Sequence, residues 1–271
     1  MAGEPPKLAP KNRRPKLPWA TLLISLAVVV FYLVLSGGFL YISNEPMLSR
    51  AFSLGNGPTS LLSHMFVHVG VRHLVGNLVP LLLFGAFLEL AIPSWHALLL
   101  FFVSGATASL LYALLTPAAP PLVGASAAVS GLMGAALSAR PRQALLLLIL
   151  TPLLLFFAAF PLLQFYSDFH SGQLAQQQSA LSSKVDALVQ QQKLEEAAAA
   201  NASLRAVSNQ AASEEQGKRR EEETPTALSV HVFGALVGVA FLFLADRKAL
   251  DEGAREFRKM GDELHSFYRM K

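Results

Sequence analysis

The chain has 271 residues, of which 53% are hydrophobic and only 15% are charged. A soluble domain has about 25% charged residues, so this composition excludes an ordinary water-soluble protein and indicates a membrane protein. The net charge of +4 comes from the basic flanks of the apolar segments, so no nucleic-acid partner is expected, and the lack of cysteine excludes disulfides and thiol chemistry.

Six apolar segments approach the roughly 20 residues that a helix needs to cross a bilayer. The fourth is short and rich in Gly, Ala and Ser, but Arg140 and Arg142 end it cleanly. We therefore predict an all-α integral membrane protein with six transmembrane helices. Their expected bounds are Trp19–Tyr41, His73–Ala91, Trp95–Leu115, Gly124–Ala139, Gln143–Tyr166 and Leu228–Ala245.

The distribution of Lys and Arg predicts the orientation of these spans, because basic residues concentrate in cytoplasmic loops. With the N-terminus inside, 14 basic residues are cytoplasmic and 8 are external, and six of those 8 belong to one long insertion. Long loops translocate largely regardless of their charge. We therefore predict an N-in/C-in protein in a lipid bilayer.

Polar segments flank and interrupt the apolar core. We expect a cytoplasmic tail at 1–18, spans one to five within 19–166, an extracytoplasmic Gln/Ala/Glu-rich helical insertion at 167–226, span six at 227–245 and a cytoplasmic amphipathic tail at 246–271. The insertion carries a weak coiled-coil-like stripe of leucine and valine residues. It fits either a solvated helix or a segment that binds a partner or a second copy through 174–209.

Polar groups inside membrane spans are costly and usually mark function. His73 and Asn77 in span two, Ser126 in span four and His231 in span six all lie near the outer ends of their spans. This shared depth predicts one polar cavity that opens outward. Glu89 lies at the cytoplasmic end of span two, where a structural role at a helix end is expected.

Small residues share the helix faces that carry the serine and the histidine. They let membrane helices approach closely, so spans four and six are expected to pack together. The stripes are Ser126, Ser130, Gly134 and Ser138 in span four, and His231, Gly234 and Gly238 in span six.

A serine beside a histidine can act as a nucleophile with its general base. No Asp or Glu lies in the outer half of any span to orient His231, so the sequence predicts a Ser126–His231 dyad without a third member. The side-chain N–H groups of Asn77 and of neutral His73 could stabilise the oxyanion of a tetrahedral intermediate.

A metal site is the main chemical alternative, because His64 and His68 have the i, i+4 spacing of metal ligands and His73 and His231 could complete the set. No inward Asp, Glu or Cys joins them, and the small-residue stripe around Ser126 would then have no explanation. We therefore predict no metal and no cofactor. A packing role alone would suit the serines but not the histidines.

Three motifs together resemble those of the rhomboid intramembrane serine proteases of bacterial type. The first is H-x3-H-x4-H-x3-N, the second is GASAAVSGLMG and the third is HVFGALVG. They begin at His64, Gly124 and His231, and the resemblance covers the six-span core from about Pro18 to Arg247.

The resemblance implies a rhomboid-like six-helix bundle in which Ser126 is the nucleophile and His231 the general base. It places His73 and Asn77 at the oxyanion site, and it assigns the active-site cavity and its water to His64, His68 and Gly124. The substrates implied are membrane proteins with a transmembrane helix, cut near the outer face. The location implied is a bacterial inner membrane.

The sequence departs from the family pattern at Ala127, where a glycine is common, and at Ser130, where an aromatic residue commonly stacks on the base. The insertion is longer than the usual link between spans five and six. None of these departures removes a reacting group. The alternative is a catalytically inactive relative that binds or escorts membrane proteins, although such proteins usually lose the serine or the histidine.

Overall fold

The computed structural model describes residues 17–37, 40–41, 57–116, 121–223 and 227–269. Almost all of the predicted tail at 1–18 lies outside these ranges. Within them, the secondary structure is helical apart from one isolated bridge between Tyr41 and Gly70. The main helices are α1 (Trp19–Ser36), α4 (Val71–Pro80), α5 (Ala86–Glu89), α6 (Ser94–Leu115), α7 (Ser126–Ala139), α8 (Pro141–Leu154), α9 (Phe160–Gln190), α10 (Leu194–Glu223), α11 (Leu228–Ala245) and α12 (Arg247–Arg269).

In the part of the chain that the structure describes, five helices are long and apolar enough to cross a membrane, which confirms the prediction of an all-α membrane bundle. They are Trp19–Ser36, Val71–Glu89, Ser94–Leu115, Pro141–Gln190 and Leu228–Ala245. The predicted fourth span is α7, an apolar helix of only 14 residues. At 1.5 Å per residue it is about 21 Å long, so six full spans remain a prediction.

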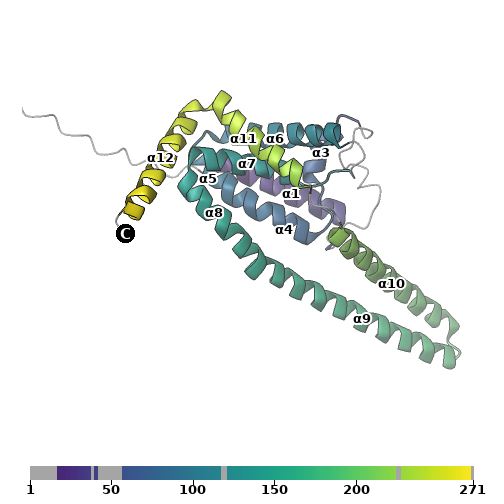
Figure 1. Cartoon of the computed structure of the whole chain (residues 1–271). Helices are drawn as coiled ribbons and strands as arrows, with labels where there is room; N and C mark the ends of the chain where they lie inside the picture. Colours follow the sequence, from purple (N-terminus) through teal and green to yellow (C-terminus); the bar gives the residue numbers. More distant parts are fainter. Residues whose placement is uncertain (1–16, 38–39, 42–56, 117–120, 224–226, 270–271) are drawn as a thin grey trace, which may run out of the picture.

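The short helix α7 lies at the centre of the bundle, between α6 and α11 (Figure 1). Its small residues let these neighbours approach on several sides, and most of its length is buried. Backbone and Cβ atoms therefore fill the space around α7, and larger side chains are not needed there. The first residue of this enclosed helix is Ser126.

Prolines do not break the second and fifth spans. Pro80 is followed by a π-helical turn at Leu81–Gly85, and Pro152 is followed by one at Leu155–Ala159. A proline lacks an N–H group and its ring crowds the preceding turn, and a single π turn is a common way for a helix to absorb such a disturbance. Each span therefore runs on through its proline.

The predicted boundary between span five and the insertion does not coincide with a helix end, because residue 167 lies inside α9. The helix from Pro141 continues without a break to Gln190, over 50 residues. Gln, Ala and Glu favour helix in water as Leu and Phe do in lipid, so the change in polarity at 167 does not end the helix.

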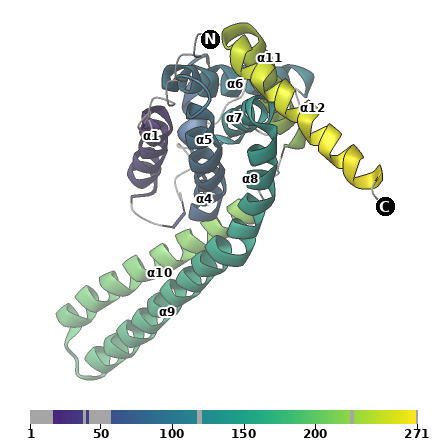
Figure 2. The same ribbon diagram turned by 90° about the vertical axis from the view of Figure 1, so that its left-hand side faces the viewer.

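The remainder of the insertion, α10, turns back and packs along α9 (Figure 2). We call α9 and α10 together the hairpin. Near its tip, Leu188 packs with Ala197 and Ala200, and Val185 lies against them. The apolar stripe is therefore used inside the hairpin. Association with another chain through 174–209 stays a prediction.

Glu89 acts at a helix end, as predicted, but the helix is α1. Its Oε1 accepts hydrogen bonds from the Thr21 backbone N–H at 2.7 Å and from the Thr21 hydroxyl at 2.6 Å. Its Oε2 accepts from the Ala20 N–H at 3.4 Å. The first turn of α1 contains no acidic residue of its own, so Glu89 satisfies N–H groups that the helix leaves free and joins spans one and two.

Candidate active site

The helices α7 and α11 are in direct backbone contact. A Cβ atom at Gly234 would overlap the carbonyl oxygen of Ala127, and one at Gly238 would overlap the carbonyl oxygen of Gly131. A Cβ at Gly134 would in turn overlap the backbone of Ala235. Only glycine permits this approach at these positions, so the small-residue stripes bring spans four and six together.

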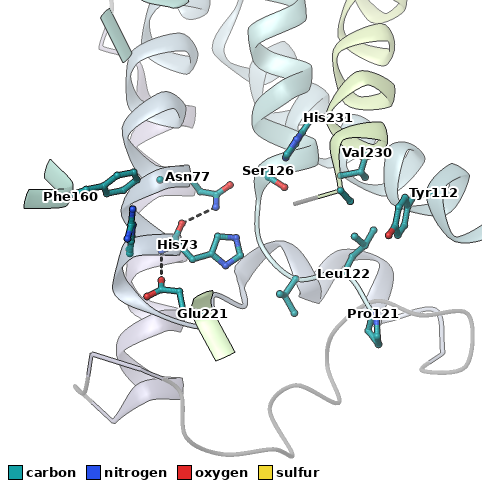
Figure 3. Close-up of a pocket in the computed structure, with 14 residues that line it drawn as sticks. His73, Asn77, Tyr112, Pro121, Leu122, Ser126, Phe160, Glu221, Val230 and His231 are labelled. Atoms are coloured by element: carbon teal, nitrogen blue, oxygen red, sulfur yellow. Dashed lines mark hydrogen bonds between the residues drawn. The ribbon is translucent and has the colours of Figure 1, made fainter. Parts of the chain in front are cut away.

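This contact places the serine beside the histidine. Ser126 is the first residue of α7, and His231 lies in the first turn of α11. The contact between Gly234 and Ala127 lies within one turn of both. Figure 3 shows the hydroxyl of Ser126 and the ring of His231 next to one another. Their relative position is therefore set by the helix backbones.

A cavity of about 350 Å³ opens at this end of the bundle. It is lined by Ser126 and His231 on one side and by His73 and Asn77 of α4 on the other (Figure 3). The structure thus brings together all four residues that the sequence placed at a common depth.

Gly124 holds the chain that enters α7 close to α4. Its φ of +98° is a left-handed conformation that favours glycine. A Cβ there would lie 2.7 Å from Nε2 of His73 and 3.7 Å from Nδ2 of Asn77. The absence of a side chain at Gly124 therefore lets both α4 side chains lie against the segment that precedes Ser126. Nδ2 of Asn77 also donates to the His73 carbonyl at 2.9 Å.

His64 and His68, which were predicted to organise the cavity and its water, are not among the residues that line it. Both are almost completely buried, with 1% and 0% of their surface exposed. The ring of His64 is hydrogen-bonded to the Ser60 carbonyl and to the Ser109 hydroxyl of α6, each at 2.9 Å. Burial lowers the pKa of His64 to about 4. Burial, followed by the nearby His73, lowers the pKa of His68 to about 3.

These two histidines instead brace the segment before the serine. The carbonyl of His64 accepts the Gly124 N–H at 2.9 Å, and Nε2 of His68 accepts the Ala125 N–H over a long 3.5 Å. Because both rings are neutral, they can sit in the core without a counter-ion. Among the described residues, no group of three or more His, Asp or Glu side chains is arranged to hold a metal ion.

Three further residues of the cavity wall were not predicted from the sequence. Tyr112 comes from α6, Phe160 from α9 and Glu221 from the last turn of α10. An aromatic residue in an apolar helix carries no signal of its own. Glu221 belongs to the charged run KRREEE, which is typical of a solvated helix surface, so its position depends on how the hairpin folds back.

The fold and the site define a polytopic helical membrane protein with a serine and a histidine that line one cavity. A family model described as "Rhomboid domain" matches residues 56–183. The matched part contains Ser126, His73 and Asn77 and ends before His231. This match spans 128 of the 271 residues, a little under half of the chain, and that part of the chain is similar to a rhomboid domain.

One curated relative is "RHOMBOID-like protein 6, mitochondrial" from Arabidopsis thaliana, which is 39% identical over 84 residues. The match covers 31% of this chain and 27% of the relative, so the chain aligns with about a quarter of that protein. No solved structure matches the chain.

Proposed function

We propose that this protein is an intramembrane serine endopeptidase that cleaves transmembrane helices of membrane proteins with a Ser126–His231 dyad. One observation carries the proposal. Ser126 and His231 line the same cavity from two helices in backbone contact, and His73 and Asn77 line its opposite wall. The similarity of residues 56–183 to a rhomboid domain supports it.

The proposed chemistry begins at Ser126. His231 takes the hydroxyl proton while Oγ of Ser126 attacks the carbonyl carbon of the scissile peptide bond. His231 then gives this proton to the leaving amine, and a C-terminal fragment departs. A water molecule, deprotonated by His231, hydrolyses the resulting acyl-enzyme and regenerates the serine.

The negative charge of each tetrahedral intermediate needs hydrogen-bond donors. The side chains of His73 and Asn77 lie across the cavity from Ser126. The Ser126 backbone N–H, in the first turn of α7, has no partner within its own helix. The positive end of the α7 dipole acts in the same direction. Oxyanion donors of this kind are worth about 10²- to 10³-fold in turnover each.

We propose that cleavage occurs near the outer face of the membrane in an N-in/C-in protein. The bias of Lys and Arg supports this orientation. The polar hairpin and the cavity lie at the same end of the bundle, since Glu221 of α10 reaches the cavity wall. The bacterial inner membrane remains a prediction from the sequence.

The test is cleavage of a single-span substrate by the purified protein in liposomes. We expect Ser126→Ala and His231→Ala each to lower the turnover by about 10⁴-fold or more. Asn77→Ala should retain part of the activity, because other donors remain. Ser138→Ala is the matched control, since the hydroxyl of this α7 serine donates to the Gly134 carbonyl within its own helix.

Labelling of the protein by a fluorophosphonate provides a second readout that needs no substrate helix. It should modify the wild type and Ser138→Ala but not Ser126→Ala. Substantial cleavage by Ser126→Ala would refute the dyad. A wild-type protein that binds membrane proteins without cleaving them or reacting with the probe would support the inactive, escorting alternative.

A further inference from the structure

The hairpin supplies a cap for the helix that carries His73 and Asn77. The residue that precedes α4 is Gly70, which has no side chain to bond the free N–H groups of the first turn. The Val71 N–H donates to the Leu40 carbonyl at 3.0 Å. The His73 N–H donates to Oε1 of Glu221 at 2.5 Å, across 148 residues of sequence (Figure 3).

Glycine on both sides lets α10 approach α4 this closely. A Cβ at Gly70 would lie 2.6 Å from Cδ of Glu221. Gly217, one turn earlier on α10, lies so close to Tyr41 that a Cβ there would overlap the tyrosine side chain. Tyr41 in turn pairs with Gly70 through an isolated β-bridge. The last turns of α10 therefore pack closely against Tyr41 and Gly70, at the start of α4.

The electrostatic surroundings favour an oxygen acceptor at the N-terminus of α4, where the Glu221 carboxyl lies. Helix N-termini carry a partial positive charge, which stabilises a nearby carboxylate. Burial raises the pKa of Glu221, whereas the backbone N–H groups of His73 and Arg72 and the charge of Arg72 oppose that rise. The Arg72 guanidinium is held over the Phe160 ring, 4.7 Å from its centroid.

A short chain of bonds links this cap to the cavity. Glu221 accepts the His73 N–H, and the His73 carbonyl accepts the side-chain amide of Asn77 at 2.9 Å. A shift in the first turn of α4 would therefore move both side chains that face Ser126. We propose that Glu221 is a positioning residue, by which the hairpin holds His73 and Asn77 in place for oxyanion stabilisation. This inference rests on the proposed function.

The principal test compares Glu221→Ala with Glu221→Gln in the full-length protein in liposomes. A misplacement of about 1 Å can cost about 10²-fold in rate, so Glu221→Ala should lower kcat by about 10- to 100-fold and leave KM unchanged. Glu221→Gln keeps an oxygen acceptor and should restore kcat to within about threefold of wild type. Glu223→Ala removes an exposed carboxylate from the same turn and is the matched control.

The fluorophosphonate probe separates positioning from substrate entry, because it is small and needs no helix to unwind. Its labelling rate should fall with kcat in Glu221→Ala. An unchanged kcat in Glu221→Ala would overturn the inference. Faster cleavage with unchanged labelling would also overturn it, since that result indicates a lid over the cavity.

A variant on the other side of the contact guards against a folding artefact. Gly70→Ala leaves α10 intact but displaces the Glu221 carboxyl, so it should reproduce the loss seen in Glu221→Ala. The double variant should be no worse than either single one, because both remove the same contact. If the losses of kcat in the two single variants add in full in the double variant, the inference is overturned.

Hydrogen exchange in residues 71–77 reports on the cap without requiring activity. Exchange should become faster in Glu221→Ala and not in Glu223→Ala. Unchanged exchange in Glu221→Ala would overturn the cap even if the enzyme is active. The two proposals can fail separately. If the wild type neither cleaves nor reacts with the probe, the proposed protease is refuted. Faster exchange in Glu221→Ala would still show that Glu221 caps α4.

Discussion

The contact between α7 and α11 makes a sharp prediction for Gly234→Ala. The added Cβ would overlap the carbonyl oxygen of Ala127, and it would lie 3.1 Å from the carbonyl carbon and 3.2 Å from Cβ of Ser130. Two of these three atoms belong to the helix backbone, so no side chain can rotate away. The helices must instead separate near Ser126 and His231.

The size of the effect follows from this geometry. An ordinary contact between such atoms needs a separation of roughly 1 Å more. Overpacking of this kind costs about 1–3 kcal/mol of stability. A displacement of about 1 Å between nucleophile and base can lower the rate by about 10²-fold. We therefore expect a folded protein whose kcat falls by about 10²-fold.

The assay is the cleavage of a single-span substrate in liposomes, together with a thermal unfolding curve for each variant. Gly172→Ala is the matched control, because a Cβ at Gly172 in α9 meets no atom within 4 Å. It should keep full activity and gain up to about 1 kcal/mol from the higher helix propensity of alanine. Wild-type kcat in Gly234→Ala would refute the idea that backbone contact sets the dyad.

Three further predictions concern stability and the hairpin. Glu89→Ala should lower the free energy of unfolding by about 2–3 kcal/mol, measured in a denaturant titration, because the bonds to Thr21 are lost; an unchanged midpoint would contradict the cap. His64 and His68 have pKa values of about 4 and 3 in the fold against 6.5 unfolded, so the unfolded state binds more protons below pH 6.5. Stability should therefore be complete above pH 6.5 and fall as the pH drops toward 4, by up to about 1.4 kcal/mol per pH unit for each ring; equal melting temperatures at pH 7 and pH 5 would contradict this. Replacing 179–207 by a short Gly-Ser turn should leave the rate of cleavage within about threefold of wild type, because Glu221 keeps its contact with the first turn of α4. A larger loss would show that the tip of the hairpin takes part in cleavage.

The four polar residues that line the cavity could be singled out from the sequence, because polar side chains are costly inside apolar spans. A histidine or asparagine in an apolar span is visible without a structure, and so is the glycine spacing beside His231. Counting charges and residues then predicts the side of the membrane and the common depth of these residues. The bundle is likewise predictable, because its helices are long and apolar.

Other features could not be predicted from the sequence, because polarity does not determine where a helix ends or where a side chain points. Span five continues past residue 167 because the residues on both sides of that change favour helix. His64 and His68 belong to the same motif as His73, yet they face Ser109 and Ala125 within the core. Glu221 looks like its charged neighbours, and only the return of α10 brings it to α4.

The unbroken helix through span five has a mechanical consequence. The part from Phe160 to Gln190 has 31 residues and is therefore about 46 Å long. Phe160 lines the cavity at one end of this rod, and very little of the fifth span is buried against the rest of the bundle. If this part of α9 tilts by about 5° about Phe160, its far end at Gln190 moves by roughly 4 Å. A displacement of the hairpin tip would therefore reach Phe160 in the cavity wall only as a small rotation.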